Sequence, residues 1–139
     1  MSLSEASNES SRLKSSKESA LHAAKAALDK NALQPVLMHV GETSGYTDYV
    51  LVVSGRSMRQ VQAIAEAIQM AMKAEAQDAL GAEGERGGHW MLLDYGDVVI
   101  HVFFHPIREY YDLEGMFGDS PRIELDVPPE QQYAEPYSS

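Results

Sequence analysis

The strongest constraint on the fold is a continuous apolar run at residues 48–55, DYVLVVSG. Its β-branched side chains follow one another without the polar alternation typical of a strand that faces water on one side. Directly after this run the apolar spacing becomes helical, at Val61, Ile64, Ala65, Ile68 and Met72. The sequence therefore predicts a strand covered on both faces, followed by a helix that packs on the sheet.

Two helices have recognisable limits. Ser57 with Gln60 three residues later is a capping box, which predicts that the second helix begins at Ser57. Gly81 follows Leu80 as a C-terminal stop, so this helix is predicted over 57–80 and is the longest element. The alanine-rich segment before the apolar run predicts an earlier helix from about 17 to 31, with Asn31 near its C-cap.

The remaining elements are short. PVLMHV at 35–40 predicts a strand. HWMLLD and DVVIHVFF, at 89–94 and 97–104, are separated only by Tyr95-Gly96, the spacing of a tight β-hairpin. Pro106 and the apolar residues after it predict a short helix at 106–113. The order α-β-β-α-β-β-α predicts an α/β (α+β) fold with a mixed β-sheet flanked by helices.

A chain of 139 residues fits one domain with tails. Residues 1–16 are rich in serine and carry too few apolar side chains to offset the entropy of ordering, which predicts a disordered N-terminal segment. Residues 122–139 have no periodicity and predict a C-terminal tail, so the single domain is predicted over 17–121. Four glycines at 81–88 predict a flexible or tightly turned link.

Charge narrows the class of partner. Residues 41–126 contain six Lys or Arg and fifteen Asp or Glu. Phosphate backbones repel such a body, so we expect no direct nucleic-acid binding, whereas a basic protein surface attracts it. Acidity for solubility alone is an equally good explanation. We expect a cytoplasmic protein, because the chain has no apolar run of about 20 residues for a membrane and no apolar signal segment at its start.

Several polar groups resemble parts of an active site. SGRS at 54–57 joins a strand to a helix N-terminus and could hold a phosphate, or could be a glycine turn before an N-cap serine. Asp94 and Asp97 could bind a metal for phosphoryl transfer, but they flank a predicted turn, where Asp is common. His101 and His105, on one face of a predicted strand, would lie about 13 Å apart, too far to share a metal. We expect no catalytic residues, no cofactor and no metal.

Trp90 is the only tryptophan and begins the predicted hairpin beside the glycine-rich link. It fits either the core or an exposed position, and tryptophan is enriched in the residues that dominate protein interfaces. Trp90 shares one strand face with Leu92 and Asp94. An aromatic, an aliphatic and an acidic side chain in a row are a plausible docking surface for a basic partner.

Unusual residues recur in a fixed order in TDYVLVVSGRSMRQVQAIAEAI and EGERGGHWMLLDYGDVVIHVFFHPIREYYDLEGMFGDSP, at 47–68 and 83–121. Over about 47–121 the chain resembles the ribosomal silencing factors, the Iojap-related family. The segment FFHP at 103–106 is one residue longer than the family's form. The first helix and both tails depart from the family and carry no inference.

The resemblance implies a nucleotidyltransferase-like fold without nucleotidyl transfer. It also implies binding to ribosomal protein fourteen of the large ribosomal subunit, a block to joining of the small subunit, and lower translation under nutrient limitation. The residues that match the family's docking region are Trp90, Met91, Leu92, Asp94, Tyr95 and Asp97.

Two further interpretations accompany the resemblance. One is a homodimer, which the family implies and which surplus apolar strand surface at 49–53 and 98–104 would favour. The other is an alternative function, a nucleotide- and Mg-dependent nucleotidyltransferase-like enzyme in which SGRS holds phosphate and Asp94 and Asp97 hold Mg²⁺.

Overall fold

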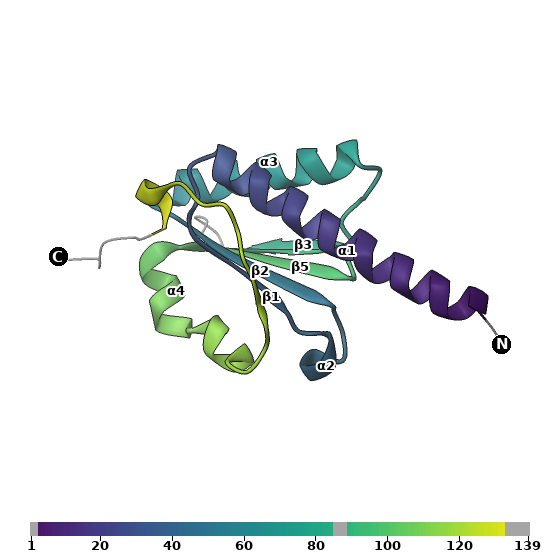
Figure 1. Cartoon of the computed structure of the whole chain (residues 1–139). Coiled ribbons are helices and arrows are strands. Elements are labelled where there is room, and N and C mark those ends of the chain that lie inside the picture. Colours follow the sequence, from purple (N-terminus) through teal and green to yellow (C-terminus); the bar gives the residue numbers. More distant parts are fainter. Residues whose placement is uncertain (1–2, 85–88, 133–139) are drawn as a thin grey trace.

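Six strands form one mixed sheet in the order β3-β4-β5-β2-β1-β6. This computed structural model describes residues 3–84 and 89–132 (Figure 1). The predictions for residues 1–2, 85–88 and 133–139 therefore lie outside the described residues. The strands are β1 (Leu33–His39), β2 (Tyr49–Gly55), β3 (Gly81–Gly84), β4 (Trp90–Asp94), β5 (Val98–Phe104) and β6 (Arg122–Ile123). The helices are α1 (Leu3–Asp29), α2 (Gly41–Ser44), α3 (Met58–Ala74) and α4 (His105–Tyr111), with 3-10 helices η1 (Leu113–Phe117) and η2 (Pro129–Gln131).

The centre of the sheet is the parallel pair β2 and β5, and all other neighbouring strands are antiparallel. Every residue of β2 is buried, which confirms the predicted strand with two covered faces. Leu51 and Val53 point into one apolar cluster, while Val50 and Val52 point into the other. The predicted mixed α/β (α+β) fold is confirmed.

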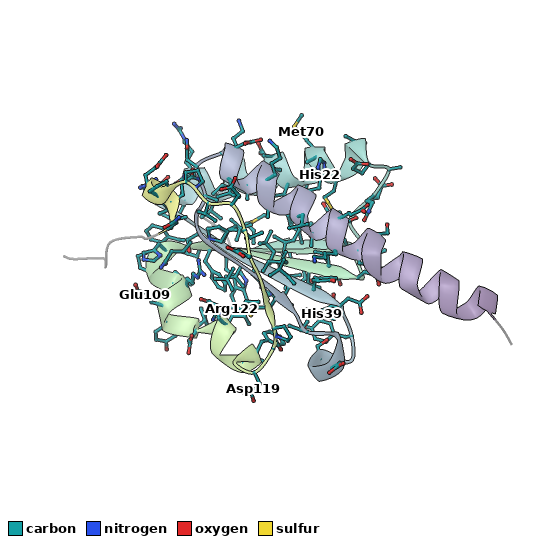
Figure 2. The ribbon with its side chains drawn as sticks, in the orientation of Figure 1. His22, His39, Met70, Glu109, Asp119 and Arg122 are labelled. Carbon is teal, nitrogen blue, oxygen red and sulfur yellow. The ribbon has the colours of Figure 1, made fainter. Side chains whose placement is uncertain are left out.

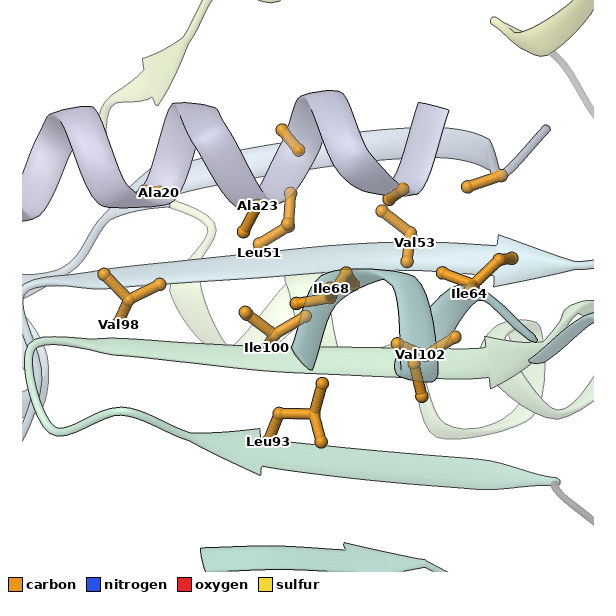
Figure 3. Packing of buried hydrophobic residues seen from close by; sticks show 14 of the residues in the cluster. Ala20, Ala23, Leu51, Val53, Ile64, Ile68, Leu93, Val98, Ile100 and Val102 are labelled. Atoms are coloured by element: carbon orange, nitrogen blue, oxygen red, sulfur yellow. The ribbon is translucent and has the colours of Figure 1, made fainter. Parts of the chain in front are cut away.

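α1 and α3 together cover one face of the sheet (Figure 1). The face of α1 that meets the sheet is built from small side chains, Ala20, Ala23, Ala24 and Ala27. These alanines let α1 pack closely on the aliphatic side chains of α3, β2 and β5 (Figure 3). His22 joins the two helices, because its Nε2 lies 3.1 Å from the carbonyl oxygen of Ala71 (Figure 2).

The opposite face of the sheet carries a smaller apolar cluster, covered by α4 and η1 on the far side from α1 (Figure 1). Phe103 and Phe117 are buried in it, and Ile107 and Leu113 pack against it. Pro106 lies in the first turn of α4, as the sequence predicts. The helix predicted at 106–113 is replaced by two pieces, because Asp112 adopts a left-handed conformation with φ of 45° and separates α4 from η1.

The capping box at the start of α3 is confirmed. The Ser57 side chain accepts a hydrogen bond from the Gln60 backbone N–H at 3.1 Å, and Gln60 Oε1 accepts one from the Arg56 backbone N–H. The predicted end at residue 80 is wrong, since α3 ends at Ala74. Ala76, with φ of 58°, closes the C-terminus, while the backbone N–H of Gln77 donates to the carbonyl of Met72. Sequence patterns do not predict this end, because an alanine occupies a position where glycine is usual.

α1 begins earlier than the start predicted at about 17. It reaches back to Leu3, so the N-terminal segment predicted to be disordered over 1–16 is helical from residue 3. No glycine or proline interrupts 3–29, and once the alanine-rich part has formed, serine lowers helix propensity by only a few tenths of a kcal/mol per residue. Asn31, with φ of 64°, follows the C-terminus of α1, as predicted.

Part of the predicted link at 81–88 is the edge strand β3, which pairs antiparallel with β4. The predicted hairpin is confirmed as β4 and β5, but its loop is the three residues Tyr95–Asp97 rather than Tyr95-Gly96. Gly96 has φ of 82°, and the Asp97 backbone N–H donates to the Tyr95 carbonyl at 3.1 Å, as in a γ-turn. Only glycine occupies the left-handed position, so Tyr95 fits the loop without strain.

The tail predicted from residue 122 is wrong for its first part. Arg122 and Ile123 form β6, which extends the sheet beside β1. Gln131 is buried, and its Nε2 donates to the carbonyls of Leu28 and Ala32 at 3.1 and 2.9 Å. The domain therefore continues past 121 to at least residue 131, because the backbone of Arg122 and Ile123 extends the sheet and the Gln131 side chain completes the end of α1.

Candidate protein-docking site

The β4–β5 register sorts the predicted docking residues by face. Trp90, Leu92 and Asp94 lie on the α4 side of the sheet, since they stand opposite Phe103, His101 and Val99 of β5. These three residues, the docking strip, are each half-exposed. A cavity of about 300 Å³ beside the strip is lined by Glu83, Gly84, Trp90 and Leu92. The strip thus combines an aromatic ring, an aliphatic side chain, an acid and a hollow.

The other three predicted residues lie elsewhere. Met91 points to the opposite face and packs against the main apolar cluster beneath α1 and α3. Tyr95 also packs against that cluster, where burial and then the Asp78 carboxylate raise the pKa of its hydroxyl. Asp97 Oδ2 accepts a hydrogen bond from Ser16 Oγ of α1 at 3.1 Å. These residues support the hairpin from behind and are not part of the strip.

Trp90 is neither a core residue nor a freely exposed one. Its ring centroid lies 5.0 Å from those of Phe103 and Tyr111, and the first of these pairs is stacked. Its Nε1–H donates to His101 Nδ1 at 3.0 Å. The inner side of the indole is therefore packed, while its remaining surface opens toward the cavity beside Leu92.

His101 is the most perturbed titratable group of the described residues. Only 5% of its surface is exposed, and burial lowers its pKa from 6.5 to about 4. The indole N–H of Trp90 can only donate, so Nδ1 of His101 must be unprotonated to accept it. His101 is therefore neutral at pH 7, with its single ring proton on Nε2.

This burial predicts a loss of stability in acid. The pKa of His101 in the folded protein lies below its value in the unfolded chain, so below pH 6.5 the unfolded chain binds a proton that the folded protein refuses. At about 1.4 kcal/mol per pKa unit, the titration of His101 lowers the free energy of unfolding by about 3 kcal/mol as the pH falls from 6.5 to 4. Above pH 6.5 His101 is neutral in both the folded and the unfolded chain, so it causes no loss of stability there.

Urea unfolding at pH 7 and pH 4.5 measures this effect. The loss of unfolding free energy between the two pH values should be clearly smaller in His101→Phe than in the parent protein, because other groups titrate equally in both. Equal losses in the two proteins would contradict the assignment.

The residues suggested for nucleotide chemistry have structural partners. Ser57 caps α3, and Ser54 is fully buried and accepts a hydrogen bond from Arg108 at 2.9 Å. A Cβ on Gly55 would stand 3.0 Å from Val61 Cγ2, so this glycine is needed for close packing of β2 against α3. Asp94 Oδ1 accepts a hydrogen bond from the Gly96 backbone N–H at 2.8 Å inside the turn. Within residues 3–84 and 89–132, no three His, Cys, Asp or Glu side chains are grouped to hold a metal ion.

No local sequence pattern indicates the buried ionic network around Arg108, which is only 4% exposed. Its Nη1 donates to the Gln34 carbonyl at 2.7 Å and to Ser54 Oγ. Its Nε and Nη2 donate to the two carboxylate oxygens of Glu114, at 3.3 and 3.1 Å. One guanidinium thus joins α4, η1, β1 and β2. Its partners are distant in sequence or, like Glu114, placed by the break between α4 and η1.

His105 does not continue the strand that carries His101, because β5 ends at Phe104 and His105 begins α4. It is buried, and its Nε2 lies 3.3 Å from Glu109 Oε1 without hydrogen-bond geometry. His101 and His105 therefore do not share a strand face. None of the helices in the part of the chain that the structure describes is long and apolar enough to cross a membrane.

Comparison with known proteins identifies the family of this chain. The family model described as "Ribosomal silencing factor during starvation" matches residues 13–139. The ribosomal silencing factor of Halalkalibacterium halodurans is 39% identical over 98 residues, which are 70% of this chain and 84% of that protein. The ribosomal silencing factor of Bacillus subtilis is 39% identical over 104 residues, 75% of this chain and 88% of that protein.

A solved structure is similar to this chain over most of its length. The crystal structure of a protein from Chromobacterium violaceum is similar with a TM-score of 0.72 and 30% sequence identity, over 85% of this chain and 98% of that one. The nucleotidyltransferase-like label for the fold stays a prediction. Since the family model covers all but the first residues, and the relatives match over most of their own length, the chain belongs to the family of ribosomal silencing factors.

Proposed function

We propose that this protein binds the large ribosomal subunit, through its ribosomal protein fourteen, and sterically prevents the small subunit from joining. It acts in the cytoplasm as a binding protein without enzymatic chemistry, and represses translation under nutrient limitation. Membership in the family of ribosomal silencing factors is the observation that carries this proposal. Steric exclusion requires tight binding at the right surface and no catalytic group.

The docking strip supplies what such binding needs. Trp90 and Leu92 offer apolar surface around a cavity of about 300 Å³, Glu83 adds a carboxylate to its lining, and Asp94 follows Leu92 on the same strand face. Ribosomal proteins are commonly basic because they bind RNA, so an acidic docking surface attracts them and repels the RNA around them. Aromatic side chains at the centre of an interface, with charges at its rim, are typical of specific protein contacts.

The remaining predicted docking residues have a supporting role in this proposal. Met91 and Tyr95 pack against the main cluster and fix the orientation of β4. Asp97 ties the hairpin turn to α1 through Ser16. The partner therefore meets Trp90, Leu92 and Asp94 directly, and the other three side chains hold this strand in place.

The enzyme alternative has little structural support. Ser54 and Ser57 accept hydrogen bonds within the fold, and Asp94 and Asp97 accept bonds from different elements. Two acids with separate partners do not form the paired ligand set that phosphoryl transfer with Mg²⁺ requires.

We also propose that the free protein is a homodimer, on the family resemblance alone. The surplus apolar strand surface that favoured a dimer is absent from β2 and β5. All residues of β2, and all of β5 except Phe104, are buried within one chain.

Sucrose-gradient sedimentation tests the proposed function. The purified protein should sediment with isolated large subunits. It should also reduce the amount of complete ribosomes that form when small subunits are added. A variant with Glu66→Lys, an exposed position on α3 away from the strip, should act like the parent. Unchanged subunit joining at saturating protein would refute the proposal, as would sedimentation with small subunits instead.

A further inference from the structure

His101 lies beneath the docking strip, on β5 directly opposite Leu92. With 5% of its surface exposed, it offers little area to a partner. Its one polar contact with a side chain of the strip is the 3.0 Å hydrogen bond that Nδ1 accepts from the Trp90 indole. Any part that His101 plays in docking must therefore act through Trp90.

Four contacts determine where the indole lies. Phe103 stacks on it at 5.0 Å with an interplanar angle of 27°, and Tyr111 meets it at 5.0 Å and 44°. The His101 ring lies tilted at 5.8 Å, in addition to the hydrogen bond. Ring stacking tolerates sliding and rotation within the plane, whereas the hydrogen bond fixes the direction of the N–H vector. The bond to His101 is thus the contact that selects one orientation of the indole.

The same bond changes what Trp90 offers to a partner. The indole has a single hydrogen-bond donor, and His101 occupies it. The open part of the ring is then carbon only, next to the cavity lined by Glu83, Gly84 and Leu92. A partner group that fits here is apolar where it meets the ring, because no donor is left to satisfy a polar one.

We propose that His101 is the positioning residue of the docking strip. Through Nδ1 it fixes the Trp90 indole before the partner arrives, and it presents the carbon edge of that ring to an apolar group of the partner. This inference rests on the proposed function. A side chain that is already ordered loses less entropy on binding, so the expected benefit is in affinity for the large subunit.

Two substitutions separate positioning from packing. His101→Phe keeps a flat ring and removes the acceptor, while His101→Asn loses the ring and keeps an acceptor near the place of Nδ1. His101→Phe should weaken binding to purified large subunits by about tenfold, the effect of one lost hydrogen bond that orders a side chain. His101→Asn should stay within about threefold of the parent. His39→Phe, the same exchange at a histidine on β1 that stacks on Tyr49, is the matched control and should bind normally.

Trp90 is the only tryptophan of the chain, so its fluorescence reports the indole alone. Its anisotropy should fall in His101→Phe and stay at the parent value in His101→Asn. In the parent protein the indole N–H should exchange slowly with solvent, as observed by NMR. This last measurement needs no variant, so it tests whether the indole N–H is held by His101 even if a substitution prevents folding.

Normal binding and unchanged anisotropy in His101→Phe would overturn the inference. Rapid exchange of the indole N–H in the parent would overturn it as well. If the parent itself does not bind large subunits, the proposed function fails. Anisotropy and exchange then still decide whether His101 holds the indole.

Discussion

Replacing Arg108 with alanine is expected to lower the free energy of unfolding by about 3–5 kcal/mol, as for other buried ion pairs that lose one partner. The substitution leaves the Glu114 carboxylate, 20% exposed, without its bidentate cation. It also removes the donor to Ser54 Oγ and to the Gln34 carbonyl, both held by Nη1. Urea unfolding followed by circular dichroism measures the loss.

Arg122→Ala is the control for this effect. Arg122 is exposed on β6, so its removal should change stability by no more than about 0.5 kcal/mol (Figure 2). The double variant Arg108→Ala/Glu114→Ala should be less unstable than the two single losses predict together, because no unpaired charge then remains. A loss below about 1 kcal/mol for Arg108→Ala would show that the network contributes little.

Replacing Trp90 with alanine is expected to weaken binding to the large subunit by about 2–4 kcal/mol, roughly 30- to 1,000-fold. The indole contributes open apolar surface to the strip and one wall of its cavity. Because the ring is half-buried and stacked on Phe103, stability should fall too, but by less than the roughly 3–5 kcal/mol typical of a fully buried aromatic residue. Sedimentation with large subunits, below the melting temperature of the variant, measures the binding.

Asp94 offers the complementary test of the same surface. Asp94→Asn keeps an oxygen for the turn bond to the Gly96 N–H and removes one charge, so it should weaken binding only modestly. Asp94→Lys reverses the charge and should weaken binding far more. Normal binding of Trp90→Ala, or equal affinities for the two Asp94 variants, would show that the partner docks elsewhere.

The sequence predicted those parts of the fold that local patterns specify. The apolar run of β2, the capping box at Ser57 and Gln60, and the β4–β5 hairpin all depend on neighbouring residues, and all are confirmed. A loop of Tyr95-Gly96 would have paired Asp94 with Asp97, whereas Asp94 stands opposite Val99. This register differs by two residues, and a shift of two preserves the faces of a strand. The prediction that Trp90, Leu92 and Asp94 share a face therefore holds.

Contacts between segments that are distant in sequence could not be predicted from the sequence. The hydrogen bond from Trp90 to His101 depends on the hairpin register, and the network of Arg108 depends on the left-handed Asp112 that separates α4 from η1. The edge strand β3 contains two glycines and has weak intrinsic preference for a strand; it exists because β4 offers it backbone partners. Each of these features depends on the tertiary structure, which brings its partners together.

The C-terminus of α1 has a consequence for how this chain is made. Gln60 donates to the carbonyls of Lys30 and Asn31, and Gln131 donates to those of Leu28 and Ala32. The end of α1 is thus completed by a side chain that lies 103 residues after Leu28 and 99 residues after Ala32. During synthesis, the carbonyls of Leu28 and Ala32 depend on water until Gln131 has been added and has left the exit tunnel. The native domain therefore closes only after residue 131 has emerged from the exit tunnel, however early α1 itself becomes helical.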